Sequence, residues 1–450
     1  MLLESYKTHF RKTFLLAYPV VISQLGHILV NLTDVIFIGK LGAVTLAACS
    51  LGISFFAVFM VFGIGIAYGM TPLVAQSHGA KDYDRCGTLL ANGVMINIGT
   101  GLLIALLIYL TTPLLYHMGQ NPEVVKQTIP FLRIIGFSII PMMLFVSFKQ
   151  FAEGLSFTRQ AMMITIVADS FNVLLTYSLI NGSFGFPALG LVGAGWANFT
   201  ARCLMALSMS IYVLRSHHFK PYLKEFKRKA LSYAESVSIV RLGTPTALQY
   251  LFEVGAFSVA AVMVGLIGAS HQAAHQIAIS LASVTYMAAS GLGAAASVRV
   301  GNAVGQKNFE QLRRSGITGY IMVIAFMTFN ALLFIAGNRI LPEYYINDLE
   351  VIHIASGLLI IAAVFQLSDG AQVVGLGALR GMGDVKVPTL ITLVAYWVIG
   401  IPLGYYLGFM LGMGVNGIWY ALSVGLTVSA VLLFLRFNQQ SRKVIEAARA

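Results

Sequence analysis

Three acidic residues lie inside long apolar stretches of this 450-residue chain, with no Lys or Arg within five residues on either side. Asp34, Glu253 and Asp369 stand in NLTDVIFIG, QYLFEVGAF and FQLSDGAQVVG. A carboxylate at the centre of a membrane span costs about 2.5–3.5 kcal/mol on insertion, so such residues persist where they have a function. Burial and neighbouring charge let a carboxyl group hold H⁺ or Na⁺ in one conformation and release it in another. We therefore expect a cation or proton site; the alternative is a carboxyl group kept protonated or hydrogen-bonded between helices.

Uncharged polar residues accompany the acids. Asn172 and Thr176 are four residues apart and share one helix face, which predicts a polar site in the first half of the chain. Gln276 and Tyr286 lie in the eighth apolar stretch. Singly, each such residue is more often an interhelical hydrogen bond than a ligand contact. We expect Gln276 to line a substrate cleft, together with Asp34.

The residues needed for catalysis or for a structural metal are missing from the sequence. It has no HExxH motif, no Walker loop and no Ser/His/Asp spacing of note. His271 and His275 are one helical turn apart, but no third ligand accompanies them, so we interpret them as helix-end histidines. The three cysteines have neither disulfide nor metal spacing. We expect neither an enzyme nor a bound cofactor.

The composition indicates which elements carry these residues. Hydrophobic residues make up 58% of the chain and charged residues only 10%, and the mean hydropathy is +0.81. Soluble proteins have about 25% charged residues. This excludes a cytosolic enzyme, a nucleic-acid-binding domain and a disordered protein, and it predicts a polytopic membrane protein surrounded by lipid.

Twelve apolar segments are long enough to cross a bilayer as helices, which need about 20 residues. Membrane strands are excluded, because they alternate in polarity over about 10 residues, whereas these segments are continuous. Helices satisfy every backbone group internally, as hydrocarbon requires. The segments are 14–38, 46–70, 91–115, 128–150, 162–182, 189–214, 238–265, 272–297, 316–340, 351–375, 387–410 and 414–436.

The Lys and Arg residues predict the orientation. Of 29, 24 fall in the termini and the loops that follow even-numbered spans, four fall on the opposite side and Arg202 lies within a span. Cytoplasmic loops carry the excess of basic residues. Both termini are therefore predicted to lie in the cytoplasm. The protein is predicted to lie in the plasma (inner) membrane. The net charge of +12 is explained by topology, and no nucleic-acid partner is expected.

The two halves of the chain resemble each other at a nearly constant offset. Six spans per half is an even number, so both halves enter the membrane in the same direction and are related by an axis along its normal. We expect a six-helix lobe at 1–214, a cytoplasmic linker at 215–237 and a second lobe at 238–450, which suits a transporter with alternating access. The matched pieces are Gly39–Ala43 with Gly265–Ala269, Gly65 with Gly291, and Gly79–Asp84 with Gly305–Glu310.

Several segments resemble the multidrug and toxic compound extrusion (MATE) family, and its NorM-type branch in particular. The resemblance covers nearly the whole chain. Its most specific pieces are AYPVVISQLG…LTDVIFIGKLGAVTLAA at 17–48, GMTPLVAQSHGAKDYD at 69–84, SVRVGNAVGQKN at 297–308 and DGAQVVGLGALRGMGD at 369–384.

The resemblance implies roles for several residues. The acidic cation site of NorM-type members falls on Glu253 and Asp369, the tyrosine near it on Tyr286, and the first-span aspartate on Asp34. The DinF-type branch usually lacks the acidic pair in the second lobe.

Two positions depart from the family pattern. Thr176 stands where NorM-type proteins often have a second Asn. In the outer loop before span ten, where some relatives contact substrate through acids, only Asp348 keeps the charge beside Asn347.

The family resemblance also implies an activity, which is export of amphipathic organic cations in exchange for Na⁺ or H⁺, by a functional monomer. Alternatives are a lipid-linked precursor flippase, an exporter of an endogenous metabolite, a receptor or scaffold, and a membrane enzyme. A flippase should line its cleft with basic residues to hold phosphates, and Arg202 is the one cation that we place in the interior of the membrane.

Overall fold

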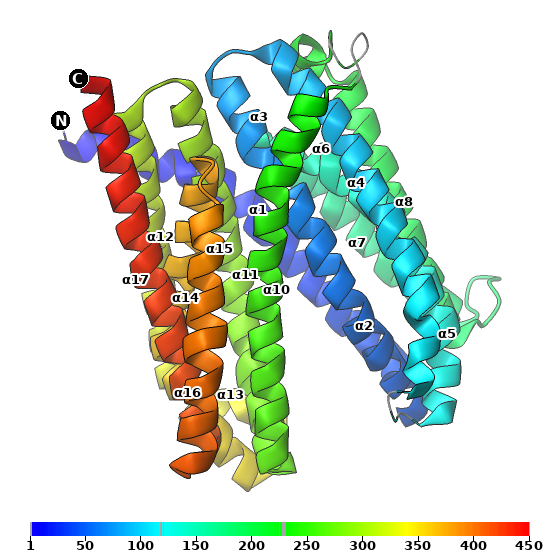
Figure 1. Cartoon of the computed structure of the whole chain (residues 1–450). Helices are drawn as coiled ribbons and strands as arrows, with labels where there is room; N and C mark the ends of the chain where they lie inside the picture. Colours follow the sequence, from blue (N-terminus) through cyan, green and yellow to red (C-terminus); the bar gives the residue numbers. More distant parts are fainter. Residues whose placement is uncertain (1, 118, 120, 225, 227–230, 450) are drawn as a thin grey trace. The chain divides into compact units, whose positions relative to one another are not determined.

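The chain folds into long α-helices in a computed structural model that describes residues 2–117, 119, 121–224, 226 and 231–449. Within these residues there is no strand, and twelve helices are long and apolar enough to span a membrane (Figure 1). This confirms the all-α fold class and the predicted number of spans. Lys227, Arg228 and Lys229, which contribute to the predicted orientation, lie outside the described residues, as does part of the predicted linker.

The helices group into two compact units by their packing. The N-unit comprises Ile22–Ala247, and the C-unit comprises Met1–Val21 with Leu248–Ala450. Two helices belong to both units: α1 (Leu2–Gly39) and α10 (Tyr233–Ile267). The other N-unit elements are α2 (Ala43–Ala67), α3 (Met70–Gly79), α4 (Tyr83–Thr111), η1 (Thr112–His117), α5 (Pro122–Phe137), α6 (Ile139–Gly154), α7 (Thr158–Asn181), α8 (Gly190–Arg215) and η2 (His217–Tyr222). The other C-unit elements are α11 (Ala269–Gly305), α12 (Phe309–Ala336), α13 (Ile340–Glu343), α14 (Leu349–Gly381), α15 (Lys386–Leu393), η3 (Val394–Gly400), α16 (Ile401–Tyr405), η4 (Tyr406–Met410) and α17 (Gly414–Arg449).

Helices α1 and α10 change units at equivalent positions. The N-terminal part of α1, through Val21, packs in the C-unit, and the N-terminal part of α10, through Ala247, packs in the N-unit. Each helix contains a proline just before the change, Pro19 in α1 and Pro245 in α10. A proline removes one backbone hydrogen bond and permits a bend. The lobe boundaries expected from the sequence stay a prediction.

Glycines let these two helices approach their neighbours closely. A Cβ added at Gly65 of α2 would lie 2.3 Å from the Cα of Ala247. A Cβ added at Gly291 of α11 would lie 3.0 Å from the backbone nitrogen of Val21. No side chain fits at the first distance, and the second leaves little room. The sequence match between Gly65 and Gly291 therefore reflects the same helix contact made once in each unit.

The internal repeat extends to the turns between helices. Lys81 and Lys307 both adopt a left-handed backbone, with φ of 61° and 53°. The next residues, Asp82 and Asn308, cap α4 and α12 by accepting hydrogen bonds from the backbone N–H of Arg85 and Gln311, each at 3.1 Å. Asp and Asn are favoured at helix N-caps because their side-chain oxygens satisfy these otherwise unpaired donors.

Several spans differ in form from simple apolar segments. The second predicted segment ended at residue 70, but its span runs from Ala43 to Gly79 as α2 and α3. Helical hydrogen bonding continues past the apolar residues, so the ends of the helices do not coincide with the ends of the predicted apolar segments. The eleventh span, Lys386–Met410, contains two π-helical stretches, η3 and η4. A π-helix alters the register of the side chains that follow it.

The C-unit core consists of two apolar clusters, separated along the helices. Both clusters contain residues of α11, α12, α14 and α17. The first includes Phe365, Trp419 and Val264 of α10, and the second includes Leu292, Val374 and Leu433. Figure 1 shows α11, α12, α14 and α17 running alongside one another, and α11, α12 and α17 each pack against α14. On these helices and α10, the interval between the clusters carries the polar residues described next.

Candidate functional site

Three polar residues predicted from the sequence meet in the interval between the C-unit clusters. They come from three helices: Glu253 from α10, Tyr286 from α11 and Asp369 from α14. The side chains of Glu253 and Asp369 are buried, at 7% and 5% exposure. The Tyr286 hydroxyl hydrogen-bonds the Glu253 carboxyl group, and Asp369 is close enough to Glu253 to interact with it electrostatically. The structure thus brings together all three residues of the predicted second-lobe site.

This acidic pair has no cationic partner in the part of the chain that the structure describes. Among the described residues, neither Glu253 nor Asp369 forms an ion pair with a basic side chain. Three buried polar atoms at this site have no hydrogen-bond partner among the described residues. They are Oδ1 of Asp369 and both polar side-chain atoms of Gln366, which lies one helical turn earlier. A buried charge is costly unless it is paired. Two neighbouring carboxyl groups without a basic partner are suited to share a proton or a small cation.

Tyr396 belongs to the first apolar cluster, but its hydroxyl reaches this polar interval, and sequence reasoning missed it. It lies in the π-helical stretch η3 and is buried. Its hydroxyl and the side chain of Gln372 exchange hydrogen bonds, with Nε2 of Gln372 donating at 2.7 Å. Tyr396 also lies within electrostatic range of Glu253 and Asp369. No sequence signal identified it, because helical spacing does not predict which face a residue in a π-helix presents.

The N-unit contains a second polar set around Asp34 of α1. The Nδ2 atom of Asn198 on α8 donates to Oδ2 of Asp34 at 3.1 Å. The Thr176 hydroxyl of α7 donates to Oδ1 of Asn172 at 3.3 Å and lies near Asp34. Asp34, Asn172 and Thr176 are all buried. The predicted first-lobe residues therefore converge, and Asn198 joins them; its place one helical turn before Arg202 was an available signal.

Unlike the C-unit pair, Asp34 has a built-in cation nearby. Arg202 of α8 interacts electrostatically with Asp34. Its Nη1 atom donates to the Ser138 hydroxyl at 2.6 Å, and its guanidinium group lies 5.0 Å from the centre of the Phe56 ring. The positive charge is thus held in place beside the acid. The two units differ in this respect, because only in the N-unit is a basic residue found beside the acid within the described ranges.

Three further acids in or beside the spans each lie next to a basic residue. Asp169 is buried, and its Oδ2 atom lies 3.2 Å from Nδ1 of His27 on α1. Glu153 is also buried, 3.9 Å from Lys149. Asp384 accepts a hydrogen bond from Arg436 at 2.8 Å. Helix packing sets the first and third pairs, and the i, i+4 spacing along α6 sets the second.

Two residues expected in a substrate cleft lie apart from the buried sets. Asp348 is the exposed N-cap of α14 and accepts hydrogen bonds from the backbone N–H of Glu350 and Val351. Gln276 is exposed on α11, and its amide contacts the Ser280 hydroxyl at 3.3 Å. Both have local structural contacts, and a role in substrate binding stays a prediction for them.

Of the two histidines of α11, His275 packs against Trp419 of α17. The Nδ1 atom of buried His275 accepts a hydrogen bond from the Trp419 indole at 3.1 Å. Within the described residues there is no cluster of three His, Cys, Asp or Glu side chains that could hold a metal ion.

Comparison with known proteins adds relatives along the whole chain. The MatE family profile matches residues 19–178 and 245–406. The starts of these two matches are related by the same offset as Gly39 and Gly265 in the internal repeat. The chain is 33% identical over 450 residues to a probable multidrug resistance protein NorM of Agrobacterium fabrum, covering 99% of this chain and 97% of that protein. It is 31% identical to the multidrug resistance protein NorM of Photobacterium profundum, covering 97% and 96%.

Solved structures show the same fold at lower sequence identity. A eukaryotic MATE transporter superposes with a TM-score of 0.89 at 21% identity, covering 98% of this chain and 99% of the other. A multidrug resistance MATE family transporter in an outward-facing conformation superposes with a TM-score of 0.90 at 18% identity, covering 97% of each chain.

Proposed function

Because the chain belongs to the MATE family of secondary transporters, we propose that it is a NorM-type multidrug efflux transporter that exports amphipathic organic cations in exchange for Na⁺ or H⁺. The observation that carries this proposal is the buried pair Glu253 and Asp369, joined by the Tyr286 hydroxyl and without an ion-pair partner among the described residues. Relatives along nearly the full chain are named as multidrug resistance proteins, which supports drug-like substrates.

The chemistry of the C-unit site fits a coupling ion. Carboxylate and hydroxyl oxygens are suitable ligands for a hard cation such as Na⁺. The same two carboxyl groups could instead share one proton, and they would then titrate as a pair. In either case, occupancy by the ion neutralises charge that is otherwise expensive to bury. A conformational change that alters the separation of α10 and α14 would change the affinity for the ion, which is what coupling requires.

The N-unit site is assigned a different role. Asp34 already has Asn198 as a hydrogen-bond donor, Thr176 close by and Arg202 as a neighbouring cation. An acid with a built-in cation has less need of an ion from solution. We infer that Asp34 acts in substrate binding or in gating of the N-unit, with Asn172 and Thr176 holding its position, and that the driving ion binds at Glu253 and Asp369.

The orientation and energetics follow from the membrane. The distribution of Lys and Arg, 24 against four, supports a plasma-membrane protein with both termini in the cytoplasm. When two ions enter for each monovalent organic cation exported, one net positive charge moves inward, and through 100 mV it releases about 2.3 kcal/mol. This corresponds to roughly fifty-fold concentration of substrate. A one-for-one exchange moves no net charge and is driven by the concentration gradient of the ion alone. Each chain holds a complete set of sites, which supports a functional monomer.

The test is transport in proteoliposomes that contain the purified protein and a cationic fluorescent dye. Na⁺ and pH gradients are imposed separately, and dye movement is recorded per molecule of protein. We expect one of the two gradients to drive accumulation against the dye gradient, while protein-free vesicles show none. Movement of anionic lipid-linked sugars, with no movement of cationic dyes under either gradient, would favour the flippase alternative.

A further inference from the structure

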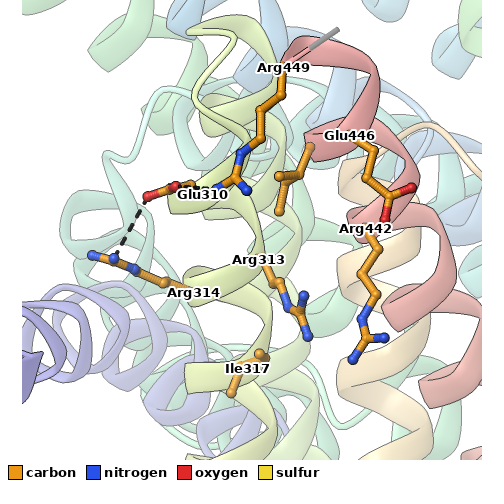
Figure 2. Close-up of a pocket in the computed structure, with 8 residues that line it drawn as sticks. Glu310, Arg313, Arg314, Ile317, Arg442, Glu446 and Arg449 are labelled. Atoms are coloured by element: carbon orange, nitrogen blue, oxygen red, sulfur yellow. Dashed lines mark hydrogen bonds and ion pairs between the residues drawn. The ribbon is translucent and has the colours of Figure 1, made fainter.

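Two adjoining pockets lie at the C-terminal end of α17 in the C-unit, away from the buried polar sites. The first, about 530 Å³, is lined by residues of α12 and α17, including Arg313, Arg442 and Glu446. The second, about 600 Å³, is lined by Ile391 of α15 and by a stretch of α17 that again includes Arg442 and Glu446. Figure 2 shows Arg313 and Arg442 extending from α12 and α17 on the same side of the first pocket.

Most charges around these pockets are already engaged. Glu310 accepts from Arg449 at 3.2 Å and lies 3.8 Å from Arg314. Arg313 donates to the Asn438 side chain at 3.0 Å, and Arg436 pairs with Asp384 at 2.8 Å. Glu310 therefore already has two arginine partners, and none of these contacts involves Arg442 or Lys443.

Arg442 and Lys443 therefore provide positive charge without an ion-pair partner among the residues that the structure describes. Within the described residues, neither has a hydrogen bond or an ion pair closer than 4.0 Å, although Glu446 lies one turn further along α17. Arg442 borders both pockets and Lys443 borders the second. Two adjacent unpaired cations on a pocket wall are suited to an anionic group such as a phosphate.

The second pocket also has an apolar wall. Leu432 and Leu435 of α17 line it at 40% and 54% exposure, together with Ile391. Leu435 and Arg442 are seven residues apart, two helical turns, and so lie on one face of α17. Along this face the side chains change from apolar to basic, as they do where a helix leaves the hydrocarbon layer for the headgroups.

We propose that this surface, defined by Ile391, Leu432, Leu435, Arg442 and Lys443, binds an anionic phospholipid of the membrane leaflet that faces the C-terminus. The headgroup phosphate contacts Arg442 and Lys443, and an acyl chain lies along the three apolar side chains. Basic pockets between transmembrane helices bind anionic headgroups in this way. A free phosphate would use only the basic part, so the apolar wall favours a lipid. This site goes beyond the transport activity and does not depend on it.

Lipid binding can be measured on the full-length protein in detergent by native mass spectrometry, with phosphatidylglycerol, phosphatidylcholine or inorganic phosphate added. We expect the protein to retain phosphatidylglycerol in preference to phosphatidylcholine. The double variant Arg442→Gln with Lys443→Gln should bind phosphatidylglycerol about 30-fold more weakly, since each basic residue near the surface contributes substantially to anionic-lipid binding. Exchanging the two residues, Arg442→Lys with Lys443→Arg, keeps the charge and should preserve binding.

The matched control is Arg11→Gln with Lys12→Gln, an exposed pair of adjacent basic residues on α1. This variant should bind phosphatidylglycerol like the wild type. An equal loss in both double variants would overturn the proposal, because it would indicate general surface attraction. Equal retention of phosphatidylcholine, or displacement of phosphatidylglycerol by inorganic phosphate at equal concentration, would also overturn it. A melting temperature equal to that of the wild type in each variant shows that a loss of binding is not a loss of fold.

Discussion

Glu253 and Asp369 lie close together on different helices, and the Tyr286 hydroxyl hydrogen-bonds the first of them. Their carboxyl groups have no basic partner among the described residues, while Asp34 of the N-unit has Arg202 nearby. The difference lies in charge balance. An acid that lacks a fixed counter-ion must recruit one from solution or take up a proton, which is the property that coupling to an ion gradient requires.

Replacing either acid by its amide keeps the shape and removes the charge. We expect Glu253→Gln and Asp369→Asn each to fold and reach the membrane, but to reduce gradient-driven dye efflux to the level of empty vesicles. Efflux is measured per molecule of protein, with membrane expression determined in parallel. Asp34→Asn should be impaired as well, through substrate binding or gating.

The matched control for the acids is Glu350→Gln, which makes the same chemical change at an exposed position in the first turn of α14. It should transport at the wild-type rate. Normal coupled efflux by both Glu253→Gln and Asp369→Asn would assign the C-unit acids a structural role and move the coupling site to Asp34.

The Tyr286 hydroxyl is expected to contribute to ion affinity, because it hydrogen-bonds a carboxyl group of the site. Hydrogen bonds to charged groups contribute about 1.5–3 kcal/mol. Tyr286→Phe should therefore raise the ion concentration for half-maximal efflux at least tenfold. Tyr320→Phe is the matched control, because the Tyr320 hydroxyl is also buried in the C-unit but makes no hydrogen bond within the described residues. A similar shift in both variants would contradict a specific role for Tyr286.

At the scale of the elements, α1 and α10 each contribute to both units, and each change of unit follows a proline by a few residues. Gly65 leaves room for α10 at Ala247, and Gly291 leaves room for α1 at Val21, which are the last residues before each helix changes unit. The equivalence is a consequence of the internal repeat, because both halves carry the same sequence pattern at a nearly constant offset. Any side chain at these glycines must displace a helix backbone.

Gly65→Ala tests this close approach. The new Cβ would lie 2.3 Å from the Cα of Ala247, so the helices must separate. Overpacking of this kind costs about 1–3 kcal/mol, and we expect a lower melting temperature in detergent. Gly99→Ala is the control, because a Cβ there meets nothing within 4 Å and alanine favours a helix. It should leave the melting temperature unchanged or raise it; equal destabilisation by both substitutions would show that the close approach at Gly65 has no special importance.

At the scale of the whole molecule, twelve candidate spans, an even number, predict that both termini lie on one side of the membrane. The surplus of Lys and Arg in the termini and alternate loops predicts that this side is the cytoplasm. Six spans in each half predict that both halves enter the membrane in the same direction, and each half supplies one of the two polar sites. The proposed direction of transport depends on this orientation, so it is worth testing separately from activity.

Single cysteines can test the orientation in a variant without Cys49, Cys86 and Cys203. A membrane-impermeant maleimide added to intact cells should label Glu123→Cys and Tyr344→Cys, which are exposed at the predicted outer side. It should not label Lys220→Cys in the predicted cytoplasmic linker, although that position is exposed in the structure. Permeabilised cells should show labelling at all three positions. Labelling of Lys220→Cys in intact cells would exclude the predicted orientation.

The sequence alone was sufficient for the features that depend on local composition. Hydrophobicity along the chain predicted twelve helices, because a span must be apolar over its own length whatever it packs against. The repeated segments, such as Gly79–Asp84 and Gly305–Glu310, predicted two similar halves. The cost of a carboxylate in hydrocarbon singled out Asp34, Glu253 and Asp369 before any contact was known.

Only the tertiary structure decided which residues meet. Asn198 joins Asp34, and His27 joins Asp169, because the partners come from different helices whose rotation and depth depend on packing. Tyr396 reaches the C-unit acids from a π-helical stretch, where an i, i+5 hydrogen-bond pattern turns side chains away from the face that α-helical spacing predicts. Likewise, Arg442 and Lys443 have no ion-pair partner among the described residues because Asp384 and Glu310 pair with other arginines. Contacts between helices are set by three-dimensional packing, and residue spacing along one helix contains no information about the residues of its neighbour.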